Sequence, residues 1–153
     1  MAQINDSVRM FALAQLTGIK TDYMECDKSG MVTCGAKEYF VLTDDEADKM
    51  ADERVRDSLW AFNAEFVAEC AGISNERTIK AIRKMQEELC EDANEIVGKL
   101  VGNVAAFSRK AIMADGRGHF ISSYDGNEQS VKIGPCEGGT HTGTLTLYVY
   151  RNN

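Results

Sequence analysis

The sequence of 153 residues has one proline, one tryptophan and two histidines, and no apolar run long enough to span a membrane. Its start, MAQINDSVRMFALAQL, lacks the basic residues and apolar core of a signal peptide. It contains no Walker lysine motif, dinucleotide fingerprint, GxSxG elbow, or cysteine motif of the papain or caspase type. These absences argue against a membrane protein and against common nucleotide-binding and hydrolase classes. We therefore expect a soluble, cytoplasmic protein.

The composition is that of an ordinary globular protein. Hydrophobic residues make up 44% of the chain and no composition shift divides it, so we expect one domain over residues 1–153. The five cysteines are an odd number, and in a cytosolic protein most should be free thiols. Cys70 and Cys90 fall on apolar faces of expected helices, where a free cysteine acts as a small core residue.

The strongest helical signal lies in residues 43–73. Thr43 and Glu46 have the spacing of a capping box, which predicts the helix start, and Asn63 is a candidate break and new cap. Apolar residues then recur every three or four positions, as expected for one buried helical face. They are Val55, Leu59, Phe62, Phe66, Cys70 and Ile73.

Two further helical regions are expected. Residues 6–17 predict a short helix that Gly18 ends. A three/four apolar pattern after Ser74 runs to Met113, which is long for one helix, so we expect a break near residues 91–94.

The remaining segments predict strands at both ends of the chain. Residues 19–42 contain the turn DKSG and indicate strand, turn, strand, with a third strand at 38–42. Towards the other end we expect strands at 119–124, 129–133 and 144–151, the first two joined by a tight Asp-Gly turn. This order predicts an α+β fold, with central helices packed on a small antiparallel sheet built from N- and C-terminal hairpins.

Negative charge is concentrated in the middle of the chain. Residues 44–95 carry fifteen acidic and seven basic side chains, a net charge of −8, whereas the whole chain carries −7. Such a surface repels nucleic acid and membrane phosphates and suits a protein partner with a basic surface. The candidate partner-binding residues are the start of the acidic helix and the tryptophan that follows it: Asp44, Asp45, Asp48, Asp52, Glu53 and Trp60. A solvated helix face is the alternative interpretation.

A basic stripe follows on the next helix. The positions Arg77, Lys80, Arg83 and Lys84 alternate with acidic residues, so we expect the stripe to neutralise itself at spacings of four. The expected pairs are Glu76–Lys80, Arg83–Glu87 and Lys84–Glu88. Direct nucleic-acid binding is therefore not expected.

The segment ADGRGHF offers an alternative, catalytic or ligand-binding site. Asp115, Arg117 and His119 lie within five residues on a glycine-rich turn, and these side chains can serve as acid, base and anion-binding groups. The competing interpretation is a helix C-cap followed by a strand, which explains both glycines by turn chemistry alone.

Metal binding has only weak candidates. Cys26, Cys34, Cys136 and His141 are zinc-type ligands, but their spacing is not that of a zinc knuckle. Cys26 and Cys34 flank the first turn and can face each other across the hairpin. We expect no metal and no cofactor.

Two blocks of the sequence carry a resemblance. EYFVLTDDEAD with SLWAFNAEFV, and ADGRGHFISSYDGNE with the closing LYVYRNN, resemble a family of small, uncharacterised phage and prophage proteins. The family brings no known active site. The resemblance implies an accessory gene of a mobile element, acting in the cytoplasm of a bacterial host cell.

These observations favour a non-enzymatic, acidic accessory protein that binds a host or viral protein. Inhibition of a host defence enzyme that handles nucleic acid, in the manner of an anti-CRISPR or anti-restriction protein, is the most specific form of this hypothesis. The first alternative is a small enzyme or ligand-binding domain that uses the ADGRGHF turn. The second is a homodimer in which Gly98 and Gly102, a small-xxx-small pair, lie at the subunit contact.

Overall fold

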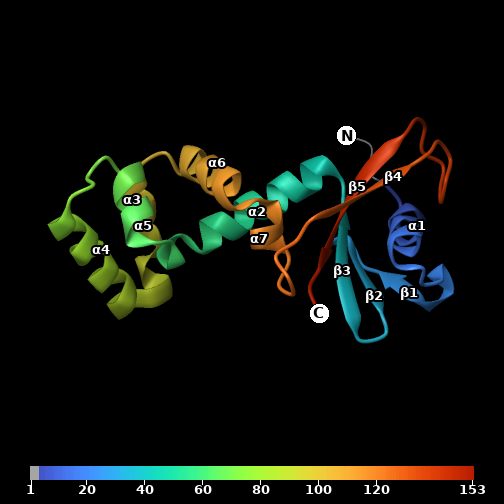
Figure 1. Ribbon diagram of the computed structural model, residues 1–153, viewed down its shortest axis with the longest axis horizontal. Coiled ribbons are helices and arrows are strands. Elements are labelled where there is room, and N and C mark those ends of the chain that lie inside the picture. Colours follow the sequence, from blue (N-terminus) through green and yellow to red (C-terminus); the bar gives the residue numbers. More distant parts are fainter. Residues whose placement is uncertain (1–3) are drawn as a thin grey trace. The chain divides into compact units, whose positions relative to one another are not determined.

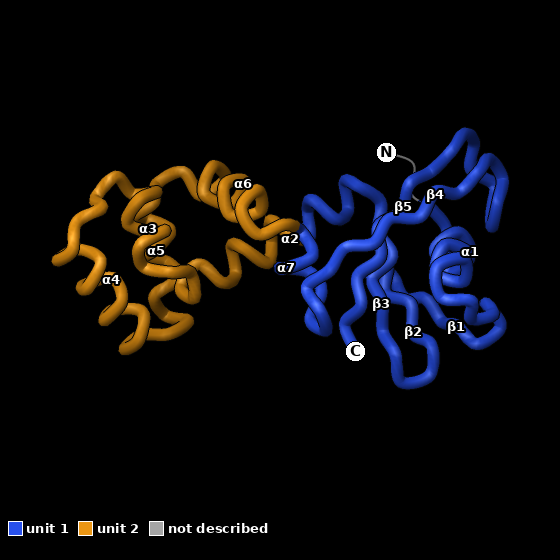
Figure 2. The backbone as a smooth tube through the Cα atoms, in the orientation of Figure 1, with its two compact units in different colours: residues 1–50, 117–153 blue, residues 51–116 orange. Residues whose placement is uncertain are grey.

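The computed structural model describes residues 4–153 and shows an α+β fold (Figure 1). The predicted fold class is thereby confirmed, and the structure is consistent with a single α+β domain. Within it the chain forms two compact units (Figure 2). We call Met1–Met50 with Arg117–Asn153 the sheet unit, and Ala51–Gly116 the helical unit.

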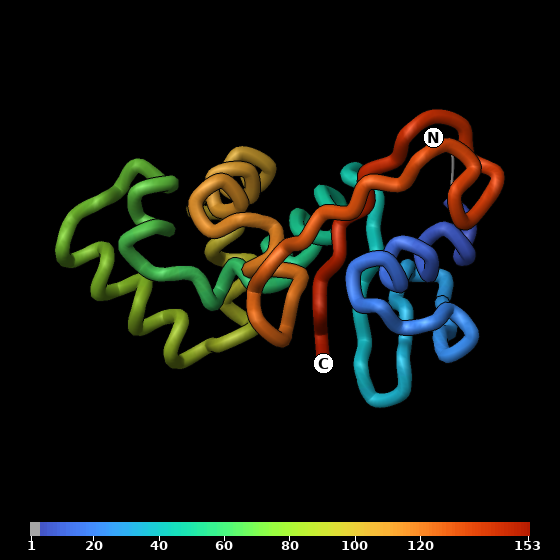
Figure 3. Tube along the Cα trace, turned by 45° about the vertical axis from the view of Figure 1, so that its right-hand side comes forward, coloured from blue at the N-terminus to red at the C-terminus, as the bar shows by residue number. Residues whose placement is uncertain are grey.

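The sheet unit is built on an antiparallel sheet whose strand order is β1-β2-β3-β5-β4. The two ends of the chain meet inside this sheet, because β3 pairs with β5 and places Val41 opposite Val149 (Figure 3). Strands from both ends were predicted to build one sheet, and this is confirmed. The strands are β1 (Met24–Cys26), β2 (Met31–Cys34), β3 (Lys37–Leu42), β4 (Gln129–Ile133) and β5 (Leu145–Arg151).

Helix α1 (Asp6–Thr17) supplies the hydrophobic layer that covers this sheet. Its side chains Val8, Ala12 and Leu13 are buried in one cluster with Val41 and Leu147 of the strands. Burial of this apolar surface is the main stabilising contribution of the contact. The helix has the predicted bounds, because the Asn5 side chain accepts the Val8 N–H at 3.1 Å and Gly18 turns the chain with φ 75°.

The predicted capping box at the start of α2 (Asp44–Asp57) is present. The Thr43 hydroxyl accepts the Glu46 N–H at 3.2 Å, and the Glu46 carboxylate accepts the Thr43 N–H at 2.9 Å. Arg9 of α1 donates to both Glu46 oxygens, at 2.7 and 2.8 Å, and to the Val41 carbonyl at 2.6 Å. This buried guanidinium links α1, β3 and the first turn of α2.

The helical unit contains the end of α2 and a series of short helices. Three aromatic side chains meet among them, with ring centroids 5.0–5.9 Å apart: Phe62, Phe66 and Phe107. The elements are η2 (Leu59–Ala61), α3 (Ala64–Cys70), α4 (Glu76–Leu89), η3 (Cys90–Ala93), α5 (Asn94–Val101) and α6 (Val104–Asp115).

The helix breaks follow local chemistry that the sequence shows only in part. Asn63 caps α3 as predicted, whereas Asn75 rather than Ser74 caps α4, its side chain accepting the Thr78 N–H at 3.0 Å. The break expected near residues 91–94 is the 3₁₀ turn η3. A second break, at Gly102 with φ 72°, was not predicted and shows that this glycine ends a helix.

Gly98, the other member of the small-xxx-small pair, packs inside its own unit. A Cβ at this position would lie 3.6 Å from the Leu59 side chain, whereas one at Gly102 would meet nothing within 4 Å. The close approach expected at Gly98 therefore occurs with a residue of the same chain. The homodimer stays a prediction.

The strand expected at 119–124 is wrong, because the chain forms the short helix α7 (Arg117–Ile121) there. A Cβ on Gly118 would lie 2.5 Å from the Gly126 carbonyl oxygen, so the glycine lets α7 pack directly on the backbone that follows. The Ser122 hydroxyl donates to Asp125 at 2.9 Å and closes the loop. The Asp-Gly turn thus folds back on α7, and β4 pairs with β5 instead.

Candidate functional site

The acidic residues predicted to bind a partner differ in how far they are exposed. Four of them are exposed on α2, whereas Asp52 is half-buried and accepts from Arg56 Nε at 2.8 Å. Trp60 in η2 is half-buried, and its backbone N–H donates to Asn94 Oδ1 at 3.0 Å. The four exposed residues are Asp44, Asp45, Asp48 and Glu53.

Arg117 engages two of these carboxylates within the sheet unit. Its Nη1 lies 2.8 Å from Asp44 Oδ1 and 2.9 Å from Asp48 Oδ1, and its Nε lies 2.9 Å from Glu128 Oε2. The guanidinium also stacks on the ring of Tyr148, 4.5 Å from its centroid. Its side chain is only 13% exposed, and its one positive charge is shared by the three carboxylates.

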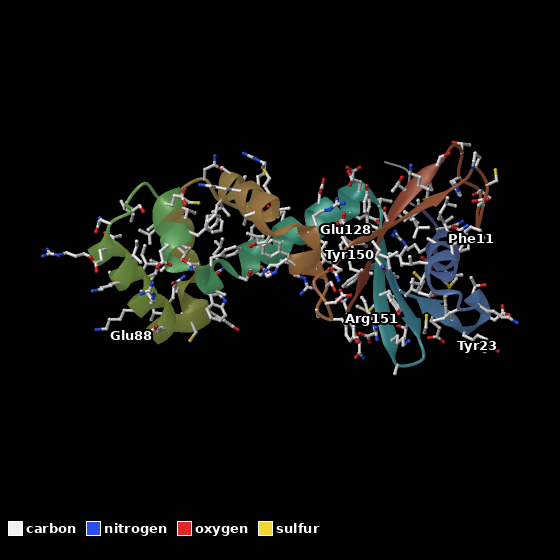
Figure 4. All side chains as sticks on the ribbon, viewed as in Figure 1. Phe11, Tyr23, Glu88, Glu128, Tyr150 and Arg151 are labelled. Carbon is white, nitrogen blue, oxygen red and sulfur yellow. The ribbon has the colours of Figure 1, made fainter. Side chains whose placement is uncertain are left out.

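The network continues into the sheet through Glu128. The buried phenol of Tyr150 donates to Glu128, and both residues are labelled in Figure 4. Burial first, and then this hydrogen bond, raise the pKa of Tyr150 well above its ordinary value. For Arg117, burial would lower the pKa, but the hydrogen bonds to Glu128 and Asp44 outweigh it and raise the pKa. We call Arg117, Asp44, Asp48, Glu128 and Tyr150 the Arg117 network.

This geometry bears on the alternative catalytic interpretation of Asp115, Arg117 and His119. The polar nitrogens of Arg117 are all directed at carboxylates of its own chain, which leaves none to bind a substrate anion. His119 is exposed on α7, and its ring packs edge-on against Phe120. Asp115 is exposed at the end of α6. The arrangement gives Arg117 a structural role, as the anchor of the start of α2.

The four candidate metal ligands lie in two places in the sheet unit. Cys26 and Cys34 are on β1 and β2, but the register puts Cys26 opposite Val32, so the two thiols do not face each other as expected. Cys136 and His141 share the loop between β4 and β5, where the Cys136 N–H donates to the His141 carbonyl at 3.1 Å. Within residues 4–153, no group of three or more His, Cys, Asp or Glu side chains is placed to hold a metal ion.

The buried thiol of Cys34 and the half-buried thiols of Cys26 and Cys70 are poor nucleophiles. All five cysteines, each in the described part of the chain, are free. Burial, and then the nearby Asp6 carboxylate, raise the pKa of the Cys26 thiol to about 11, and burial also raises the pKa of Cys34 and Cys70. Cys90, expected in the core, is exposed, because it begins η3 with φ 49° and turns away from the face of α4.

A second acidic surface lies in the helical unit, at the end of α4 and in η3. Its side chains are exposed, and among residues 4–153 they make no ion pair or side-chain hydrogen bond. The next acidic residue along the chain, Glu95, is paired with Lys99 at 3.2 Å. We call this set the α4–η3 carboxylates: Glu87, Glu88 (labelled in Figure 4), Glu91 and Asp92.

The sequence did not single out these residues because it assigned two of them to ion pairs. Arg83 was expected to pair with Glu87, but its Nη2 lies 2.7 Å from Glu65 of α3. Of the three pairs expected on this helix, Glu76–Lys80 is the one observed among residues 4–153, at 3.6 Å. Which carboxylate Arg83 reaches depends on the packing of α3 on α4, and no local spacing shows that.

Apolar side chains are exposed on the helix that follows the α4–η3 carboxylates. Ile96 and Leu100, four residues apart on α5, are 41% and 37% exposed. Residues at this spacing lie one turn apart on the same helical face. The C-terminal residue of α4, Leu89, is 40% exposed. The helical unit therefore presents both unpaired carboxylates and exposed apolar side chains.

Comparison with protein-family models, with curated proteins and with solved structures finds no match to this chain. In the described residues, 4–153, no helix combines the length and the apolar character that crossing a membrane requires.

Proposed function

We propose that this chain is a non-enzymatic binding protein that uses the helical unit to bind a protein with a basic surface. The observation that carries the proposal is the set of four exposed α4–η3 carboxylates without an internal cation. The acidic start of α2 was the sequence-based candidate for this role, but Asp44 and Asp48 already pair with Arg117. The binding surface is accordingly assigned to the α4–η3 carboxylates.

Physical chemistry supports a partner that is both basic and partly apolar. Unpaired carboxylates accelerate the approach of a basic surface and select against acidic ones, and they repel phosphates. Exposed apolar side chains such as Ile96 and Leu100 supply area that is buried when the complex forms. A protein partner uses both features, whereas a nucleic acid uses neither.

The resemblance to small phage and prophage proteins suggests where the chain acts and what kind of partner it binds. In that setting the chain acts in a bacterial host and binds a host or viral protein. Proteins that handle nucleic acid carry basic grooves for phosphates, and an acidic protein can occupy such a groove. Inhibition of a host defence enzyme of this kind is the specific function we propose.

Capture from a host lysate with matched charge variants tests the proposal. The test variant carries Glu88→Gln, Glu91→Gln and Asp92→Asn. The control carries Asp22→Asn, Glu25→Gln and Asp115→Asn, three exposed acids elsewhere on the chain, so both variants have the same net charge. A stoichiometric partner should bind the wild type and the control, be lost with the test variant, and weaken as salt is raised.

The inhibitory form of the proposal has its own readout. If the captured partner cleaves or modifies nucleic acid, its activity should fall at stoichiometric amounts of this protein, and the test variant should restore it. Equal capture by wild type and test variant would show that the α4–η3 carboxylates are not the binding surface.

A further inference from the structure

A partly open cavity of about 440 Å³ lies in the sheet unit, between the start of α1 and the loop that joins β4 to β5. Its volume falls in the range of small-molecule sites, roughly 300–1,000 Å³. None of its residues belongs to the Arg117 network or to the helical unit. The lining residues form a polar set, Asn5, Thr43, Thr140, His141 and Thr142, and an apolar set, Ile4, Val8 and Leu145.

The lining offers hydrogen-bonding groups that the described chain does not use. The hydroxyls of Thr140 and Thr142 make no hydrogen bond within residues 4–153. The Thr43 hydroxyl accepts the Glu46 N–H and also bonds to the Glu46 carboxylate, so it is already used by its own chain. A ligand with several hydroxyl groups can bond to both Thr140 and Thr142.

His141 adds an acceptor that lacks a partner. Its Nε2 lies 2.7 Å from the Gly134 carbonyl oxygen, so this nitrogen carries the hydrogen and Nδ1 of the neutral ring is left as the acceptor. In the described structure Nδ1 is buried and has no hydrogen-bond partner. A buried acceptor without a partner is destabilising, so a ligand hydroxyl that reached this nitrogen would be favoured.

The charges around the cavity decide the class of ligand. No Asp, Glu, Lys or Arg is among the lining residues. The two helices that begin at the cavity carry carboxylates in their first turns, at Asp6 of α1 and at Asp44 and Asp45 of α2. These carboxylates offset the attraction of helix N-termini for anions, so a phosphate or carboxylate ligand is disfavoured.

We propose that this cavity binds a small neutral ring compound that carries several hydroxyl groups, such as a nucleoside or a monosaccharide. The apolar side chains Ile4, Val8 and Leu145 receive the face of the ring, and Thr140, Thr142 and His141 bind its hydroxyls. The proposal does not rest on the proposed function, because its residues all belong to the sheet unit.

The test is an NMR titration of ¹⁵N-labelled full-length protein, in which amide shifts report both binding and the fold. The neutral probes are adenosine, uridine, glucose and N-acetylglucosamine, and the charged probes are AMP and glucose 6-phosphate, all at millimolar concentration. At least one neutral probe should shift the amides of residues 140–145, and its phosphorylated counterpart should bind about tenfold more weakly. Binding of adenosine or uridine identifies the ligand as a nucleoside, and binding of glucose or N-acetylglucosamine identifies it as a sugar.

Variants then assign the binding to the threonines. Thr140→Val with Thr142→Val removes two hydroxyls at nearly constant shape and should weaken binding about tenfold. The matched control, Thr21→Val with Thr78→Val, changes two threonines outside the cavity and should bind like the wild type. The proposal would be overturned if no neutral probe shifted the amides of residues 140–145, or if the phosphorylated probes bound equally well. Unchanged affinity in the double-valine cavity variant would overturn it too.

Discussion

The start of α2 and the end of α4 are both rich in carboxylates, but these carboxylates differ in whether they form ion pairs within the chain. Asp44 and Asp48 of α2 share one guanidinium, that of Arg117, which is 13% exposed. Glu88 and Asp92 have no ion-pair partner within residues 4–153. The first pair of acids is part of the fold, and the second pair is available to a partner.

The comparison shows that a run of acidic residues does not by itself indicate a binding surface. What separates the two regions is one arginine brought from far along the chain, more than sixty positions from Asp44. A paired carboxylate contributes to stability, and its cation weakens the attraction that it exerts on a partner. An unpaired carboxylate contributes little to stability and attracts a basic partner with its full charge. The two properties can be measured separately.

The largest effect is expected from Arg117→Met, which removes the cation of the Arg117 network. Glu128 would be left beside the buried Tyr150 without its cation, and the stacking on Tyr148 would be lost. We expect the free energy of unfolding to fall by about 2–4 kcal/mol, measured by urea denaturation followed by circular dichroism.

Arg83→Met is the matched control for this measurement. Arg83 pairs with Glu65, but both side chains are about half exposed, so the loss should be at most about 1 kcal/mol. Equal losses in the two variants would contradict the structural role given to Arg117.

The sequence predicted the features that depend on neighbouring residues. The end of α1 at Gly18, the capping box at Thr43 and the cap of α3 at Asn63 were all predicted from short spacings, and all are present. These signals are local, because a side chain within three positions satisfies the first amides of the helix.

The features that were missed depend on residues far apart in the chain. ISSYDG is typical of a strand and turn, yet α7 forms before it because Gly118 fits the backbone of residues 126–128. Arg83 was assigned to the nearest acid on its own helix, but it reaches Glu65 of α3. In both cases tertiary packing overrides the local pattern, and the unpaired α4–η3 carboxylates are one consequence.

A smaller effect, dependent on pH, is expected from Glu46→Gln. The hydrogen bonds from Arg9 are the main cause that lowers the pKa of the Glu46 carboxyl below its usual value of 4.5. A carboxyl whose pKa is lower in the folded state stabilises the protein above its unfolded pKa and loses that contribution as the pH falls through the folded value. At pH 7 the variant should be less stable than the wild type by about 1–2 kcal/mol.

The pH profile separates this charge effect from a simple packing defect. The difference between wild type and Glu46→Gln should shrink as the pH is lowered below 4.5, because the carboxyl is protonated first in the unfolded state and, at lower pH, in the folded state. Urea denaturation at several pH values between 7 and 3 gives the profile. A difference that stayed constant over this range would assign the loss to packing at Arg9.

The smallest effect on stability is expected from two double variants of equal charge, which compare the carboxylates at the start of α2 with the α4–η3 carboxylates. Asp44→Asn with Asp48→Asn removes two partners of Arg117 and should lower stability by about 1 kcal/mol, because both side chains are largely exposed and the pairs are screened by water. Glu88→Gln with Asp92→Asn removes two unpaired carboxylates from a surface that carries four, so stability should stay equal or rise by a few tenths of a kcal/mol through reduced repulsion. Denaturation in low and high salt sharpens the contrast, since salt should narrow both differences. If the second variant proved the less stable, the α4–η3 carboxylates would belong to the fold, and their assignment to a partner would lose its physical basis.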